Sequence, residues 1–175
     1  MIIQFCGLSG SGKTTLANKL RLMLSDTDIK IEIIDGDMYR KSLCADLGFS
    51  KADRNENIRR LAGIAAGLAN HHVVPIICAI NPYDDIRLEI ADKYKDVKTV
   101  YIDCSLEVLI SRDTKQLYRK ALLSDGHPEK INNLSGVNDP FEIPQNPDLV
   151  IRTDGEPIET SSQKLLNFIL CALAK

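Results

Sequence analysis

The sequence lacks the features that mark several classes of protein. No apolar stretch approaches the roughly 18–20 residues of a membrane-spanning helix, so we expect no membrane partner. No charged segment precedes an apolar run at its start, so we expect no signal peptide. There is no basic run, and 22 basic against 24 acidic residues give a net charge of −2, which argues against a nucleic-acid partner.

Closely spaced cysteines are absent as well. The five cysteines are far apart, none forms a CxxC pair, and their number is odd. This favours reduced thiols in the cytoplasm over a disulfide framework. Cys6, Cys78 and Cys104 lie in or beside apolar runs, which indicates small buried core residues rather than a zinc site or a nucleophile.

What the chain does have is a regular alternation of two patterns over 175 residues, the usual size of one domain. Apolar runs predict strands at 2–6, 31–34, 73–79, 97–103 and 149–151. Apolar residues at helical spacing predict helices at 14–24, 53–70, 86–94, 105–112 (capped by Ser105) and 160–174. The alternation predicts an α/β fold with a five-stranded parallel sheet and helices on both faces.

The clearest motif follows the first predicted strand. Residues 7–14 read G-L-S-G-S-G-K-T and match G-x-x-x-x-G-K-[ST] at every fixed position. Its backbone N–H groups and the following helix N-terminus suit phosphate, Lys13 suits the β- and γ-phosphates, and the Thr14 hydroxyl suits Mg²⁺. The motif predicts a P-loop for ATP and Mg²⁺ made by Gly7, Leu8, Ser9, Gly10, Ser11, Gly12, Lys13, Thr14 and Thr15.

One long segment interrupts the alternation. Residues 115–146 are polar and rich in glycine and proline. An irregular stretch of this length in a compact domain is usually a functional lid or disordered. We interpret the chain as a single P-loop kinase domain, residues 1–175, with a lid at about 113–146.

Two carboxylates lie at the end of the second predicted strand. Asp35 and Asp37 flank Gly36, and Arg40 follows shortly after. Ligands of open α/β sheets bind beyond the carboxyl ends of the strands, so a carboxylate here can orient or deprotonate an attacking hydroxyl. The alternative is an ordinary Asp-Gly turn with Asp37 as a helix N-cap.

A P-loop alone does not distinguish a kinase from a GTPase switch or from a non-catalytic nucleotide-binding protein. The N-K-x-D tetrad that reads guanine is absent, and no D-x-x-G element stands where a γ-phosphate sensor would. These absences favour a kinase over a GTPase. Turnover of ATP with candidate acceptors distinguishes a kinase from a non-catalytic protein.

The chain resembles the adenylylsulfate (APS) kinase family over nearly its whole length. Besides the P-loop, the likeness rests on D-G-D at 35–37 with Arg40, L-G-F-S-K-A-D-R-N-E-N-I-R-R at 47–60, D-T-K-Q-L-Y at 113–118 and G-V-N-D-P-F-E at 136–142. The resemblance implies transfer of the γ-phosphoryl group of ATP·Mg²⁺ to the ribose 3′-hydroxyl of adenylylsulfate. It also allows for a homodimer, because dimers are common in the family.

The resemblance implies roles for individual residues. Asp37 would orient or deprotonate the 3′-hydroxyl, and Lys13 would be the second catalytic residue. Phe49 would stack on the acceptor base, and Lys115 would reach the phosphates from the lid. Arginines offer planar forks for phosphate or sulfate. The implied acceptor site comprises Asp35, Arg40, Phe49, Arg54, Asn57, Ile80, Asn81, Lys115 and Leu134.

The acceptor side departs from the family pattern. Leu134 replaces the second aromatic of F-T-G, and Asn81 replaces the serine of I-S-P-Y. Loss of a stacking partner is worth about 1–3 kcal/mol by analogy with base–aromatic stacking. A relative of the family phosphorylates the 3′-hydroxyl of cytidine diphosphoramidate. Its pyrimidine is smaller than adenine, and Leu134 opposite Phe49 would suit it. Both acceptors therefore stay open, adenylylsulfate and a cytidine diphosphate derivative.

Overall fold

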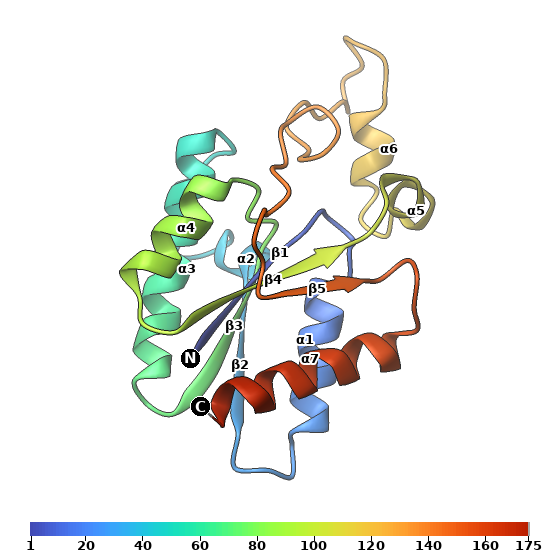
Figure 1. Cartoon of the computed structure of the whole chain (residues 1–175). Helices are drawn as coiled ribbons and strands as arrows, with labels where there is room; N and C mark the ends of the chain where they lie inside the picture. Colours follow the sequence, from blue (N-terminus) through green and yellow to red (C-terminus); the bar gives the residue numbers. More distant parts are fainter. Residues whose placement is uncertain (175) are drawn as a thin grey trace.

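Five parallel strands form one sheet in the computed structural model, which describes residues 1–174 (Figure 1). The order across the sheet is β2–β3–β1–β4–β5. The strands are β1 (Ile2–Cys6), β2 (Lys30–Asp35), β3 (Val73–Cys78), β4 (Val97–Asp103) and β5 (Leu149–Arg152). The predicted α/β fold with a five-stranded parallel sheet is confirmed.

The helices alternate with these strands along the chain. They are α1 (Lys13–Met23), α2 (Gly36–Tyr39), α3 (Lys51–Ala69), α4 (Asp84–Lys93), α5 (Leu106–Arg112), α6 (Leu117–Ala121) and α7 (Ile158–Leu173). The segment between α5 and β5 includes α6 and rises above the carboxyl ends of the strands (Figure 1). This segment contains the residues that the sequence predicts to be a lid.

The strand order fixes where a ligand can bind. The chain runs from central β1 to β2 and β3 on one side, then to β4 and β5 on the other. In open α/β sheets, ligands bind in the crevice where the order reverses, outside the carboxyl ends of the strands. That crevice lies at the end of β1, and all five β1 residues are buried, as expected for a central parallel strand.

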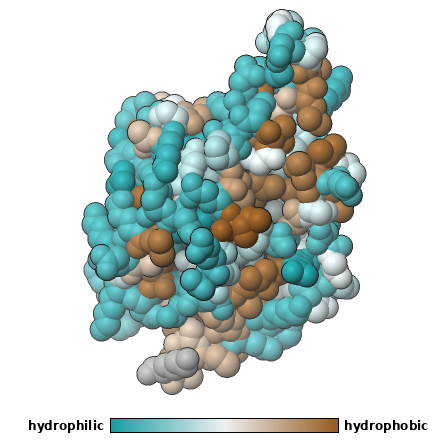
Figure 2. Space-filling view, turned by 45° about the horizontal axis from the view of Figure 1, so that its top comes forward, coloured by the Kyte–Doolittle hydropathy of each residue, from teal (hydrophilic) through white to brown (hydrophobic). Residues whose placement is uncertain are grey.

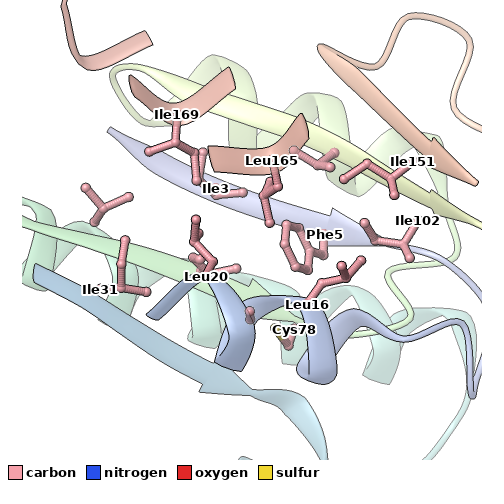
Figure 3. Packing of buried hydrophobic residues seen from close by; sticks show 14 of the residues in the cluster. Ile3, Phe5, Leu16, Leu20, Ile31, Cys78, Ile102, Ile151, Leu165 and Ile169 are labelled. Carbon is pink, nitrogen blue, oxygen red and sulfur yellow. The ribbon is translucent and has the colours of Figure 1, made fainter. Parts of the chain in front are cut away.

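A hydrophobic layer packs on each face of the sheet. On one face, α1 and α7 contribute Leu20 and Ile169 to a core that surrounds Phe5 (Figure 3). On the other face, α3 and α4 contribute Leu61 and Ile86 to a second core. The two layers hold β1, and therefore the loop that follows it, in a fixed position.

The sequence patterns located most elements to within one or two residues. The short helices α2 and α6 were not predicted, because four and five residues are too few to show a helical period. Ser105 does precede α5, but the predicted side-chain cap is wrong. Its backbone N–H instead donates to Asp154 Oδ2 at 2.7 Å, which ties the start of α5 to the end of β5.

Cys6, Cys44, Cys78 and Cys104 are buried, and the expectation of core thiols is confirmed. Burial raises the pKa of Cys6 and of Cys78 to about 12, so both are neutral thiols near neutral pH. Within residues 1–174, no helix combines the length and the apolar character that a bilayer crossing requires.

The α1 core gives a test of the packing. Leu20 is fully buried, whereas Leu22 on the same helix is 70% exposed. Leu20→Ala should lower the free energy of unfolding by about 2–5 kcal/mol, because it removes buried methyl groups and leaves a cavity. Leu22→Ala is the matched control and should change it by less than about 0.5 kcal/mol. Urea unfolding measures both, and equal losses would contradict the described packing.

Candidate functional site

The P-loop, residues 7–14, connects β1 to α1. A Cβ on Gly7 would lie 2.4 Å from the Ile102 carbonyl oxygen, so only glycine fits beside β4. Gly12 has φ +96° and is the N-cap of α1, a left-handed conformation that glycine adopts without strain. The loop therefore delivers the positive end of the α1 dipole to the carboxyl end of β1.

Lys13 is folded back onto this loop. Its Nζ donates to the carbonyl oxygens of Gly7 at 2.8 Å and Leu8 at 2.7 Å. The side chain is buried, and burial lowers the pKa of Lys13 to about 8. Lys13 thus lies inside the loop with a weakened preference for its charged form. Phosphate oxygens can replace the loop carbonyls as its partners and favour the charged form.

Thr14 lies against a carboxylate from the next strand. The Thr14 hydroxyl donates to Asp35 Oδ2 at 2.8 Å, while Asp35 Oδ1 accepts from the backbone N–H groups of Asp37 and Met38. Asp35, rather than Asp37, is the N-cap of α2. A hydroxyl and a carboxylate oxygen next to a phosphate loop are a donor set that fits Mg²⁺, which keeps waters and takes few protein ligands.

Asp37 lies two residues further on, in the first turn of α2. Its carboxylate is 69% exposed and accepts from Lys115 Nζ at 2.5 Å. Lys115 comes from the segment above the sheet, so this ion pair joins that segment to the end of β2. Because Asp35 caps the helix, the Asp37 carboxylate is free of a capping role and can contact a ligand.

These groups border one cavity of about 710 Å³ at the carboxyl ends of the strands. Figure 2 brings this end of the molecule forward and shows hydrophilic and hydrophobic residues interspersed on it. The cavity is lined by six residues of the predicted ATP site, Ser9, Gly10, Gly12, Lys13, Thr14 and Thr15. It is also lined by all nine residues expected at the acceptor, Asp35, Arg40, Phe49, Arg54, Asn57, Ile80, Asn81, Lys115 and Leu134. Gly7, Leu8 and Ser11 support the loop from outside the lining.

The guanidinium groups of two arginines lie near the Phe49 ring. The guanidinium carbon of Arg40 lies 4.6 Å from the centre of the Phe49 ring, and that of Arg54 lies 5.4 Å from it. Burial, and then the neighbouring charge of Arg54, lowers the pKa of Arg40. Two cations held close together without full compensation favour an anion between them. Arg54 Nη2 is also 3.0 Å from Asp139 Oδ2. This carboxylate, from the segment between α5 and β5, neutralises part of the Arg54 charge.

Several contacts that the sequence did not reveal hold the walls of the cavity. The Tyr118 hydroxyl donates to the Ser9 carbonyl at 2.8 Å, which attaches α6 to the P-loop. The Thr153 hydroxyl donates to the Ser11 carbonyl at 2.9 Å, and Arg112 Nη2 donates to the Thr153 carbonyl at 3.0 Å. The one available signal for Thr153 is its place two residues after the last predicted strand.

The lowered pKa of Lys13 predicts a proton uptake. At pH 8.5 the free protein holds Lys13 mostly neutral, because its pKa is about 8. Triphosphate binding favours the charged form, so it should take up a fraction of a proton. Calorimetric titration with ATP in two buffers of different ionisation enthalpy measures that fraction.

The matched control for this titration is Lys13→Arg, whose guanidinium stays charged at pH 8.5. This variant should show no uptake. Equal uptake by both proteins, or none by the wild type, would contradict a Lys13 held at a lowered pKa.

Comparison with known proteins agrees with this geometry. The family model for adenylylsulphate kinase matches residues 1–152. The chain is 40% identical over 168 residues to the adenylyl-sulfate kinase of Deinococcus deserti, covering 96% of this chain and 90% of that one. It is 39% identical over 175 residues to the adenylyl-sulfate kinase of Chloroflexus aurantiacus, covering 100% of this chain and 89% of that one.

Solved structures give the same result. The Mycobacterium tuberculosis APS kinase CysC in complex with AMPPNP and APS matches with a TM-score of 0.87 at 35% identity, covering 96% of each chain. The Aquifex aeolicus shikimate kinase, at 17% identity and a TM-score of 0.55, shares the fold. The chain belongs to the adenylylsulphate kinase family and is an ATP-dependent phosphotransferase that acts on a hydroxyl group.

Proposed function

We propose that this enzyme transfers the γ-phosphoryl group of ATP to the ribose 3′-hydroxyl of adenylylsulfate, with Asp37 and Lys13 as its catalytic residues. The observation that supports this most is that one cavity joins Lys13 of the P-loop to Asp37 and to Phe49 with its neighbouring arginines. Its volume of about 710 Å³ is within the usual range for a small-molecule site. Donor and acceptor nucleotides can therefore meet in one cavity, with Asp37 between them.

Transfer forms a bond between the 3′-oxygen and the γ-phosphorus and breaks the bond from that phosphorus to the bridging oxygen, which leaves with ADP. The hydroxyl proton passes to Asp37. Because the transition state is loose, Asp37 acts first by orienting the hydroxyl and only then as a base. Lys13 leaves its loop carbonyls for the phosphates and balances the charge on the transferred group.

Lys115 gives Asp37 a partner while the acceptor is absent. The entering 3′-hydroxyl would replace Lys115 as the hydrogen-bond donor to Asp37. The Lys115 ammonium would then be free for the transferring phosphoryl group. We propose that residues of about 113–146 form a lid that carries Lys115 into the site.

Mg²⁺ would be held by the Thr14 hydroxyl and by a carboxylate oxygen of Asp35. Both are hard oxygen donors that already lie 2.8 Å apart. When bound there, the ion supplies positive charge to the β- and γ-phosphate oxygens. Asp35 was expected on the acceptor side, and its contact with Thr14 supports a role toward the metal.

The other acceptor considered, a cytidine diphosphate derivative, rests on the side chains expected around the base. Leu134 is 4% exposed and packs beside Tyr118 and Leu8, whereas Phe49 is 50% exposed. The base would thus meet one aromatic ring and one aliphatic side chain, which suits a pyrimidine. The relatives named above are adenylyl-sulfate kinases and favour adenylylsulfate.

The role of Asp37 is tested by Asp37→Asn, which keeps the shape and removes the carboxylate. We expect kcat to fall about 10²–10⁴-fold, the usual contribution of such a group, with little change in ATP binding. Asp92→Asn is the matched control, since Asp92 is exposed on α4 and outside the cavity lining. Steady-state kinetics measure both. A kcat for Asp37→Asn within about threefold of wild type would limit Asp37 to a structural role.

The acceptor is tested by kcat/KM for adenylylsulfate and for cytidine diphosphate derivatives, with ATP·Mg²⁺ as donor. We expect a preference of tenfold or more for adenylylsulfate. Leu134→Phe should raise kcat/KM for adenylylsulfate, by no more than the roughly 1–3 kcal/mol of one stacking contact. An enzyme that ignores adenylylsulfate and phosphorylates a cytidine diphosphate derivative would overturn the proposed acceptor.

A further inference from the structure

Two Ser-Gly pairs follow one another in the P-loop, Ser9-Gly10 and Ser11-Gly12. In both pairs the glycine has a positive φ, +77° at Gly10 and +96° at Gly12. Because glycine tolerates either sign of φ, the peptide unit that precedes it is easily flipped. A flip exchanges the directions of its carbonyl and its N–H. The directions of the Gly10 and Gly12 N–H groups therefore need a restraint from elsewhere in the protein.

The first restraint is the hydroxyl of Tyr118. It donates to the Ser9 carbonyl oxygen at 2.8 Å, and Tyr118 is only 2% exposed. The Tyr118 ring packs in an apolar cluster with Leu109 and Leu134. Burial raises the pKa of Tyr118, so its hydroxyl keeps its proton and stays a donor near neutral pH. Loss of this donor would leave the carbonyl oxygen of a buried serine unpaired, which is costly.

The second restraint is the hydroxyl of Thr153. It lies 2.9 Å from the Ser11 carbonyl oxygen and 3.2 Å from that of Asp103. The Asp103 carbonyl already accepts from the Thr153 backbone N–H at 2.9 Å. A hydroxyl has one hydrogen to donate, so that of Thr153 serves Ser11, which is fully buried.

Both hydroxyls approach the loop from outside the cavity. Within residues 1–174, the lining of the cavity includes Gly10 and Gly12 but neither Tyr118 nor Thr153. The C=O and N–H of one trans peptide unit point in opposite directions. A carbonyl held by a donor behind the loop thus turns the N–H of the same peptide unit toward the cavity. Backbone N–H groups that converge in this way form an anion-binding site.

We propose that Tyr118 and Thr153 are positioning residues for the phosphates of the donor nucleotide. They hold back the carbonyls of the two serines and so keep the N–H groups of the two glycines directed at the phosphates before ATP arrives. Such preorganisation raises affinity because binding does not have to order the loop. The inference rests on the proposed function only in placing the phosphates of ATP on the P-loop, and it holds for either acceptor.

The test removes each hydroxyl and keeps the shape of the side chain, with Tyr118→Phe and Thr153→Val. Without its donor, the peptide unit can flip in the free protein, and binding must reverse the flip. We expect the calorimetric dissociation constant of ADP to rise about 3- to 10-fold in each variant, the effect of one hydrogen bond. KM for ATP should rise similarly, with kcat and the acceptor KM within about twofold of wild type, as for a loss of uniform binding.

Two further variants serve as controls. Tyr101→Phe makes the same chemical change elsewhere: the Tyr101 hydroxyl donates to Asp103 Oδ1 at 3.0 Å, and neither residue belongs to the P-loop. Its ADP affinity should equal that of the wild type. Thr153→Ser keeps the hydroxyl and should restore the ADP affinity that Thr153→Val loses. Thermal unfolding of the same variants distinguishes a structural role, because lower stability with unchanged ADP affinity would overturn the inference.

Lys13→Ala separates this inference from the proposed function. An ADP affinity that falls in Lys13→Ala but stays within about twofold of wild type in Tyr118→Phe and Thr153→Val overturns the inference alone. An affinity unchanged in all three variants also overturns the placement of the phosphates on the P-loop. Weaker ADP binding in all three, in an enzyme that rejects adenylylsulfate, supports the inference and overturns only the proposed acceptor.

Discussion

The hydrogen bonds of Lys13 to the carbonyl oxygens of Gly7 and Leu8 are the interaction on which the site depends. They close the P-loop around a buried cation at the end of the central strand. Burial keeps this cation poorly solvated, so phosphate oxygens are better partners for it than the loop itself. The two hydrophobic layers of the sheet hold β1 and α1 in place, and thereby fix the position of the loop between them.

The segment above the sheet is built onto this loop rather than attached loosely to it. Tyr118 bonds to the Ser9 carbonyl, and Lys115 pairs with Asp37. Further along, Arg54 Nη2 donates to the Asn133 carbonyl and lies 3.0 Å from Asp139. The P-loop, the Asp37 carboxylate and helix α3 therefore each contact the same segment. Motion of that segment would alter all three at once.

Much of this arrangement could be predicted from the sequence, because its signals are local. Continuous apolar runs identified the strands, and the G-x-x-x-x-G-K-[ST] spacing identified Lys13 and Thr14. The alternation of strands and helices then gave the parallel sheet and the edge at which Asp35 and Asp37 lie. The resemblance of residues 47–60 to a known family added Phe49 and Arg54, which no periodicity would single out.

Contacts between distant parts of the chain could not be predicted. The Gln4 side chain hydrogen-bonds with Asn81 and Thr99, which are 77 and 95 residues away, and only the register of β1 with β3 and β4 brings them together. The contact of Asp35 with Thr14 spans 21 residues. Asp35 also caps α2, but that helix is too short to show a helical period in the sequence. In each case the residue type was visible in the sequence, but the partner depended on the fold.

In the proposed reaction, the P-loop, the Asp37 carboxylate and the acceptor pocket direct one phosphoryl group to one hydroxyl. The ³¹P spectrum of the product formed from ATP·Mg²⁺ and adenylylsulfate tests this most directly. We expect a new phosphomonoester resonance that couples to the proton on ribose C3′. Coupling to a different ribose proton, or release of inorganic phosphate in place of a phosphorylated nucleotide, would contradict it.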